Sequence, residues 1–307
     1  MRRSSAGYEW YKGQLADNVQ AFLARHPGAA CDETFMEAVR ESGFALAMAP
    51  EELGGLQCSL AEAATVARVW GYQAAPLPIV ELLLSGYAAR IEPDLELTTT
   101  FMPRGGGERL AAWFPGVERC VDLSGAGSTI APVGERSAST TLATETLVAV
   151  TRDAAASSLR LAGDDLLPRG ALLTAARMLG AMERVLELTV EHVTLRQQFG
   201  RPIARFQLVQ AMAADAASEV AASRAVIGDA LAVVDHGETA DLLWRAAKIQ
   251  AARAATLVSA HAHQMFGAIG FTEEHELHRF TTSLLAWRTV WGSTASIEEE
   301  MGRLACT

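Results

Sequence analysis

The chain has 307 residues, of which 50% are hydrophobic and 20% are charged, and its formal net charge at pH 7 is -10. This length is enough to bury a sizeable core. The acidic balance argues against nucleic-acid binding, which depends on clustered Lys and Arg. No apolar run approaches the roughly 20 residues of a membrane-spanning helix, so we expect a soluble chain without a membrane span.

The N-terminal segment and the cysteines bear on the cellular compartment. MRRSSAGYEW carries two arginines with no apolar segment behind them, so it lacks the pattern of a secretory signal. The cysteines are widely scattered and form no CxxC pair, which argues against a disulfide framework and a structural zinc. The histidines show no ligand pattern joined to carboxylates. We therefore expect a cytoplasmic protein with reduced thiols and no metal site.

Residues 1–90 have a helical pattern interrupted by loops. Apolar residues recur at helical spacing in WYKGQLADNVQAFLARH and in ETFMEAVRESGF. A loop is expected over Ala47–Ser59. Ser59 then precedes a further helical pattern and Glu62 follows three residues later, which is the spacing of a capping box. We predict a small N-terminal helical domain.

Residues 91–168 differ in composition, because Gly, Thr and Ser become frequent. TTLATETLVAVT and SLRLAG show the alternation that is typical of half-buried strands. The GAG of Gly125–Gly127 lacks the third glycine of a dinucleotide-binding fingerprint, so a turn is expected there. We predict a reduced β domain.

Residues 169–307 are rich in Ala, Leu, Met and Val. Long helical patterns lie near 170–198, 205–235, 239–266 and 274–300, and the short connections between them indicate antiparallel neighbours. The predicted fold is therefore mainly α with a small β domain, and it ends in an antiparallel four-helix bundle.

The connection LRQQFGRPIARFQ, between the first two of these helices, has two interpretations. Gly200 can provide a left-handed cap for one helix, and Pro202 fits the start of the next, so the segment can be a simple turn. A turn does not account for Arg196, Phe199 and Gln207, which gather where a helix N-terminus offers N–H groups to an anion. A ligand with an anionic group and a flat ring would use all three.

A second candidate site lies in HQMFGAIGFTEE, between the third and fourth predicted bundle helices. Gly267 and Gly270 permit close approach of a backbone or a ligand. Gln264 beside them can both donate and accept hydrogen bonds.

These two segments resemble motifs of the acyl-CoA dehydrogenase family. The family carries an Arg-x-x-Phe-Gly turn followed by a Phe-Gln or His-Gln helix start, and later a Gln-x-x-Gly-Gly-x-Gly-Phe turn. APEELGG, at Ala49–Gly55, resembles the family's Pro-Glu-Glu-Gly-Gly loop. The helical, β, helical order of the chain is also similar.

The resemblance implies FAD as cofactor and the α,β-dehydrogenation of an acyl-CoA thioester. It further implies that Arg196 and Phe199 contact the adenosine pyrophosphate part of FAD, and that Gln207 assists nearby. Gln264 and Gly267 would meet the same cofactor from a neighbouring subunit. Family dehydrogenases pass their electrons to an electron-transfer flavoprotein, which is an expected partner.

The same resemblance locates the general base of the reaction, a carboxylate that removes the α proton. The commonest family position lies in a Tyr-Glu-Gly-Thr segment, which corresponds here to VWGST at Val290–Thr294, with Trp291 in place of the Tyr. The alternative position on the first bundle helix falls near Gly170. Neither holds a carboxylate. The family's flavin-facing segment has only an echo in DLSGAGST, Asp122–Thr129.

Three functional hypotheses follow. The first is an acyl-CoA dehydrogenase-like flavoprotein that works in a hetero-oligomer, whose second, similar subunit supplies the base; sterol side-chain or other bulky acyl-CoA catabolism fits this arrangement. The second is a structural partner without catalysis. The third is a homo-oligomeric enzyme with a displaced base among Glu298–Glu300 or at Asp164 and Asp165. Retention of Arg196, Phe199 and Gln264 favours the first.

Overall fold

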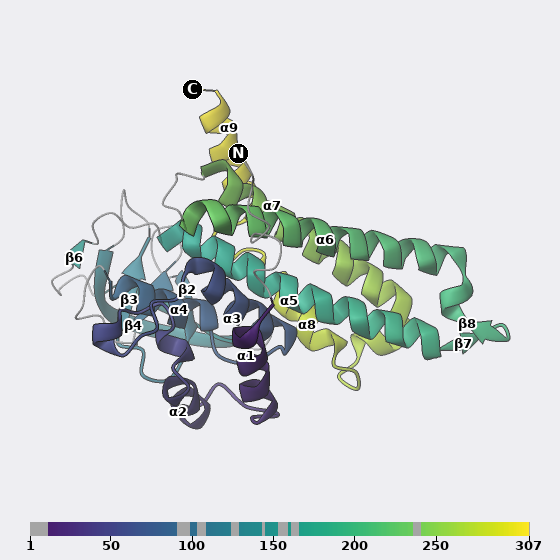
Figure 1. Cartoon of the computed structure of the whole chain (residues 1–307), viewed down its shortest axis with the longest axis horizontal. Coiled ribbons are helices and arrows are strands. Elements are labelled where there is room, and N and C mark those ends of the chain that lie inside the picture. Colours follow the sequence, from purple (N-terminus) through teal and green to yellow (C-terminus); the bar gives the residue numbers. More distant parts are fainter. Residues whose placement is uncertain are drawn as a thin grey trace.

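The structure, a computed structural model, describes residues 12–90, 99–102, 109–123, 129–142, 145–152, 159–160, 166–235 and 241–306. This part of the chain is mainly helical, and long helices extend to one side of the sheet and the N-terminal helices (Figure 1). The predicted fold class, mainly α with a small β component, is confirmed. None of the described helices is both long and apolar enough to cross a membrane.

The N-terminal part of the described chain contains α1 (Gln14–Ala24), α2 (Glu33–Glu41), α3 (Leu60–Tyr72) and α4 (Ile79–Ala88), with the short 3-10 helices η2 (Phe44–Leu46) and η3 (Glu51–Leu53). The predicted capping box begins α3. The Glu62 N–H donates to Ser59 Oγ at 3.2 Å, and the Ser59 N–H donates to a Glu62 carboxylate oxygen at 2.8 Å. These bonds satisfy two N–H groups that the helix itself cannot.

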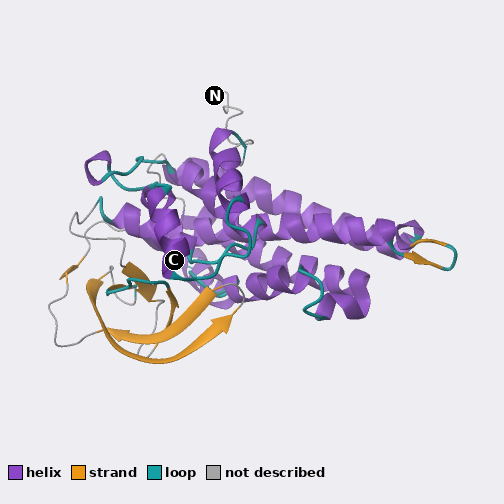
Figure 2. Cartoon of the chain, turned by 90° about the horizontal axis from the view of Figure 1, so that it is seen from below, coloured by secondary structure: helices purple, strands orange, loops and turns teal. Residues whose placement is uncertain are grey.

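The main sheet follows α4 in the sequence and contains β1 (Thr99–Met102), β2 (Arg109–Trp113), β3 (Arg119–Asp122), β4 (Thr129–Leu142), β5 (Glu145–Arg152) and β6 (Leu159–Arg160). Its order is β1-β3-β4-β5-β2, with β6 paired to β4; β1 and β3 are parallel and the other pairs antiparallel. The long strands curve beneath the helices in Figure 2. The predicted runs cover parts of β4 to β6. The strands β1 to β3 are too short for alternation to stand out.

The C-terminal part of the described chain contains α5 (Leu166–Leu195), α6 (Gln207–Asp235), α7 (Asp241–Phe266), α8 (Leu277–Trp287) and α9 (Thr294–Ala305), with the 3-10 helices η4 (Ile203–Arg205) and η5 (Gly267–Phe271). The single helix predicted over 274–300 is wrong. Trp291 and Gly292 have φ angles of +58° and +106°, which an α-helix cannot contain. Ser293 then caps α9 by accepting the Ser296 N–H at 3.1 Å.

The first bundle helix, α5, also forms the contact with the N-terminal helices. A Cβ added to Gly71 on α3 would lie 1.9 Å from the Arg177 carbonyl oxygen, and one added to Gly180 on α5 would lie 1.9 Å from that of Arg68. The two backbones therefore pack at a distance that only glycine allows. Beside this crossing, Arg68 pairs with the buried Glu183 at 2.6 Å.

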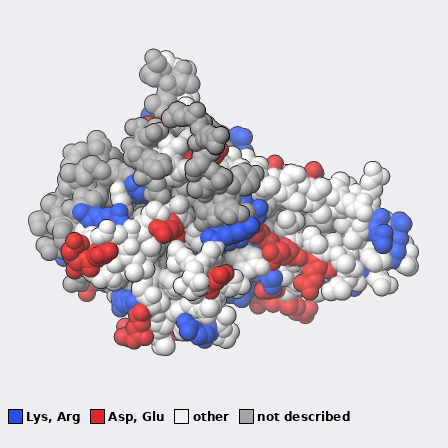
Figure 3. All heavy atoms as spheres, in the orientation of Figure 1, with Lys and Arg blue, Asp and Glu red and all other residues white. Residues whose placement is uncertain are grey.

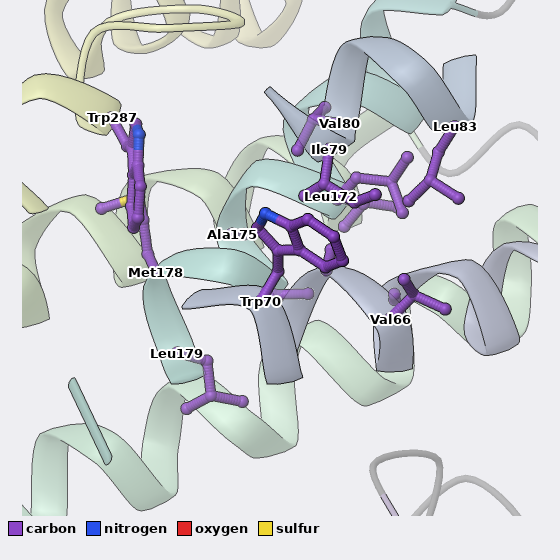
Figure 4. Packing of buried hydrophobic residues seen from close by; sticks show 14 of the residues in the cluster. Val66, Trp70, Ile79, Val80, Leu83, Leu172, Ala175, Met178, Leu179 and Trp287 are labelled. Carbon is purple, nitrogen blue, oxygen red and sulfur yellow. The ribbon is translucent and has the colours of Figure 1, made fainter. Parts of the chain in front are cut away.

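A continuous apolar core joins these parts. Trp70, completely buried, lies among side chains of α3, α4 and α5 (Figure 4), and its Nε1 donates to the Pro76 carbonyl oxygen at 2.8 Å. The same cluster reaches from Val19 in α1 to Ile297 in α9. The division into domains at 1–90, 91–168 and 169–307 stays a prediction.

Candidate functional site

The residues predicted to hold the cofactor lie at one end of the bundle, where α5 and α7 end and α6 begins (Figure 1). Two contacts establish this arrangement. The ring of His192 stacks on Phe266 with centroids 4.1 Å apart, and the Ile203 N–H donates to the Arg196 carbonyl oxygen at 2.9 Å. The C-terminal end of α5, which Arg196 follows, and the last turn of α7, which contains Gln264, are therefore neighbours within one chain. That a neighbouring subunit contributes to the same cofactor stays a prediction.

A two-residue hairpin turn presents Phe199 to solvent. The strands β7 (Gln197–Gln198) and β8 (Arg201–Pro202) are antiparallel, and Phe199 and Gly200 between them have φ angles of +53° and +77°. Such a turn favours Asn-Gly or Gly-Gly, so Phe199 adopts an unfavourable conformation. Its side chain is 90% exposed. An aromatic ring held in this way can stack on a flat ligand.

The hairpin also changes the roles predicted for Gly200 and Pro202. Gly200 does not cap the preceding helix, because α5 ends at Leu195 and Gly200 belongs to the turn. Pro202 ends β8, and α6 begins five residues later at Gln207. The simple helix-turn interpretation therefore fails in detail, because a two-stranded hairpin lies between the two helices.

Positive charge gathers at this end of the molecule. Arg196 is exposed directly after α5, and Arg201 and Arg205 follow in the hairpin and η4. Figure 3 shows one group of basic side chains at this end of the molecule. Gln207 is the exposed first residue of α6. The first N–H groups of a helix have no intrahelical acceptor and favour an anion. The arrangement therefore suits a phosphate group.

Gln264 and Gly267 lie at the C-terminal end of α7. Gln264 is exposed in the last turn of α7, and Gly267 is exposed with a φ angle of +66°. A Cβ built on Gly267 would meet no atom within 4 Å. The surface above Gly267 is thus open, and a ligand can approach its backbone while Gln264 offers both a donor and an acceptor.

Arg196 also lines a cavity of about 490 Å³. The cavity lies between the last turns of α5 and the segment before α8, and its lining comprises Arg184, Leu188, Glu191, His192, Leu195, Arg196, His275 and Glu276. Burial lowers the pKa of His192, and His275 and Arg196 lower it further. The lowered pKa favours the neutral imidazole of His192 at pH 7.

Together these groups fit the adenosine pyrophosphate end of FAD. A guanidinium and a helix N-terminus suit a pyrophosphate, and an exposed aromatic ring suits an adenine. The amide of Gln264 suits a polar edge of either. No cluster of three or more His, Cys, Asp or Glu side chains that could hold a metal ion occurs among the residues described by the structure.

The two positions implied for the general base lie at the opposite end of α5. Gly170 is in the second turn of α5, and a Cβ added to it would lie 2.2 Å from the ring of Trp291. Gly292 follows Trp291, and a Cβ there would lie 2.9 Å from Ile297 Cδ1. The structure therefore brings the two positions together, and an indole ring fills the space beside Gly170.

A buried carboxylate that the sequence did not suggest lies behind this indole. Trp291 is 5% exposed and Glu81, on α4, is 4% exposed; the indole Nε1 donates to Glu81 Oε1 at 3.1 Å. The ring of Phe101 lies on Trp291 with centroids 5.2 Å apart. A single acid in the apolar helix IVELLLSGYA was the available signal, because a buried carboxylate needs a partner.

Two of the acids considered as displaced bases are held in ion pairs with arginines of α7. Glu298 pairs with Arg253 at 2.5 Å on the surface, and Glu300 pairs with Arg245 at 3.2 Å. Asp164 and Asp165 lie outside the described residues, as do residues 124–128 of the segment compared with the flavin-facing motif.

Comparisons with known proteins bear on the family and the fold of this chain. A family model described as acyl-CoA dehydrogenase, C-terminal domain, matches residues 161–303. The acyl-CoA dehydrogenase IpdE2 of Mycobacterium tuberculosis is 30% identical over 289 residues, which cover 87% of this chain and 88% of the relative.

Two solved structures show the same fold. The ChsE4-ChsE5 complex from Mycobacterium tuberculosis has a TM-score of 0.83 at 23% identity, covering 97% of this chain and 99% of that chain. Butyryl-CoA dehydrogenase from Megasphaera elsdenii has a TM-score of 0.77 at 18% identity, and each chain is covered completely, at 100%. By its relatives, the chain belongs to the acyl-CoA dehydrogenase family of FAD-dependent oxidoreductases.

Proposed function

We propose that this chain is the FAD-holding subunit of a hetero-oligomeric acyl-CoA dehydrogenase, and that a second, similar subunit supplies the catalytic base. One observation carries the proposal. Gly170 and Gly292 stand at both implied base positions, while the opposite end of α5 presents Arg196 and Phe199 to solvent. A chain that had lost every role in catalysis would not need to keep Arg196 and Phe199 exposed.

In the proposed complex, each of these exposed residues contacts a different part of the cofactor. Arg196 neutralises the pyrophosphate together with the N-terminus of α6. Phe199 stacks on the adenine, and Gln264 forms hydrogen bonds beside Gly267, whose open surface lets the cofactor approach. FAD held by these residues would supply the hydride acceptor that α,β-dehydrogenation requires. The α proton must pass to a carboxylate of the other subunit, because neither base position of this chain has one.

The relatives support a hetero-oligomer and a bulky acyl group. The ChsE4-ChsE5 structure is a complex of two proteins, and another similar structure is described as a steroid acyl-CoA dehydrogenase, with a TM-score of 0.82 at 19% identity. We therefore propose a bulky acyl-CoA thioester, such as a sterol-derived one, as substrate. An electron-transfer flavoprotein would reoxidise the flavin.

The first test is the visible absorption spectrum of the purified chain, before and after FAD is added and the unbound excess is removed. We expect a protein-bound flavin band. Arg196→Ala should weaken FAD binding roughly tenfold or more, because a hydrogen bond to a charged group contributes about 1.5–3 kcal/mol. Arg303→Ala, which removes another exposed arginine from α9, is the matched control and should leave FAD binding unchanged.

The second test adds a subunit that carries the glutamate of a Tyr-Glu-Gly-Thr segment. The complex should reduce its flavin when an acyl-CoA is added, whereas the chain alone should not. Turnover by the chain alone would contradict the assignment of the base to the partner. If no flavin is retained either alone or in the complex, the chain is a structural subunit.

A further inference from the structure

We propose that the indole of Trp291 occupies the acyl site of this chain, so that no acyl group binds between α5 and the loop before α9. The inference rests on the proposed function in one respect only, which is that the two implied base positions mark where an acyl group would lie. Everything else comes from the packing around Trp291.

The first step concerns the space between the two base positions. A carboxylate at either position would have to reach the same α carbon, so the substrate must lie between them. In this structure Cε3 and Cδ2 of Trp291 lie 2.2 and 2.3 Å from the point that a Gly170 Cβ would occupy. The ring is therefore in contact with the α5 backbone, and no acyl chain can pass between them.

The second step concerns how firmly the indole is held. Trp291 has a φ angle of +58°, a conformation that is unfavourable for a bulky side chain. Such strain persists only where the surroundings enforce it. Here the buried hydrogen bond to Glu81 and the contact with the ring of Phe101 hold the indole in place.

The third step concerns Gly170 itself. Glycine inside a helix is less favourable than alanine, because it loses more conformational freedom on folding. Gly170 nevertheless lies inside α5, where its missing side chain is the space that the indole fills. Gly170 and Trp291 therefore form one unit, in which each residue requires the other.

A double-mutant cycle tests this coupling. Gly170→Ala should lower Tm by more than about 5 °C in the wild-type background, because its methyl group collides with the indole. In the Trp291→Ala background the same change should leave Tm unchanged or raise it by up to about 4 °C, because alanine is the better helix former. An equal loss in both backgrounds would overturn the proposal. If Trp291→Ala does not fold, Trp291→Leu provides the second background.

A ligand test examines the closed site directly, with butyryl-CoA and free CoA as probes in isothermal titration calorimetry. The wild-type chain should bind butyryl-CoA no more tightly than CoA. Trp291→Ala should bind butyryl-CoA at least about tenfold more tightly than CoA, because each buried methylene contributes about 0.8 kcal/mol. A preference for butyryl-CoA in the wild type, or its absence in folded Trp291→Ala, would overturn the proposal.

Trp70→Ala is the matched control for the ligand test. It also removes a buried indole with a hydrogen bond, but from the core between α3 and α4, and it should create no preference for butyryl-CoA. None of these measurements depends on flavin. If FAD is retained neither by the chain alone nor by its complex, but Gly170 and Trp291 show the coupled behaviour, the proposed function is refuted and the closed site stands.

Discussion

The aromatic residues beside the two ends of α5 have similar φ angles but opposite solvent exposure. At each end an aromatic residue with a positive φ angle precedes a glycine: Trp291-Gly292 lies beside the start of α5, and Phe199-Gly200 follows its end. Trp291 is 5% exposed, whereas Phe199 is 90% exposed. Both aromatic residues therefore have a left-handed φ angle, and their surroundings decide whether the ring is buried or exposed.

The difference shows how one chain can fill the proposed acyl site while it keeps the proposed cofactor site open. Trp291 is fixed by Glu81 and by contact with Gly170. Within the described part of the chain, the ring of Phe199 has Phe206 as its aromatic neighbour, with the ring centroids 6.0 Å apart. Unfavourable backbone conformation at an exposed position is evidence of a role that packing does not explain.

Of the predicted changes in stability, that of Gly180→Ala in the middle of α5 should be the largest. Gly180→Ala would place a methyl group 1.9 Å from the Arg68 carbonyl oxygen, and this backbone cannot move without separating α3 from α5. We expect a loss of at least about 3 kcal/mol in the free energy of unfolding. Urea denaturation measures it. Gly302→Ala, an exposed helical position with no atom within 4 Å, should instead stabilise the chain by up to about 1 kcal/mol.

A smaller effect concerns the buried Lys248, which donates to the carbonyl oxygens of Trp287 and Arg288 at 3.0 Å, where the Trp291 loop begins. Burial, with a contribution from Arg288, lowers the pKa of Lys248 from 10.5 to about 7. Between these values the unfolded chain binds more protons, so the free energy of unfolding rises with pH, by at most about 1.4 kcal/mol per unit.

Lys248→Met should remove this rise, as measured by denaturation at several values between pH 7.5 and 9.5. The exposed Lys12 provides the matched control, because Lys12→Met should keep the wild-type slope. If Lys248→Met and the wild type show the same slope, the lysine is not held as a buried amine at the closed end.

The smallest expected effect on stability lies at the open end. Phe199→Asn places a residue that tolerates positive φ at the first turn position, so the free energy of unfolding should stay the same or rise by at most about 1 kcal/mol. FAD retention should nevertheless fall, because the stacking ring is lost. A marked loss of stability, or unchanged FAD binding, would contradict the proposal that Phe199 serves ligand binding rather than packing.

Local signals were strong enough to predict much of this fold. The capping box at Ser59 and the apolar periodicity of α5, α6 and α7 depend on residues within a few positions of one another, and these elements lie where they were predicted. The helix expected over 274–300 was wrong, because its break at Trp291 depends on contacts with Gly170 and Glu81, which are distant in sequence. The hairpin at Phe199 was missed because its strands have two residues each.

The sequence by itself determined the family, the candidate cofactor residues and the lack of a carboxylate at both base positions, because these are properties of residue types and short spacings. The tertiary structure was needed to show what fills the space beside the two vacant base positions. It placed an indole from the loop before α9 against a glycine in α5, and a carboxylate from α4 behind it. Those three elements meet through packing of segments far apart in the chain, which no local pattern encodes.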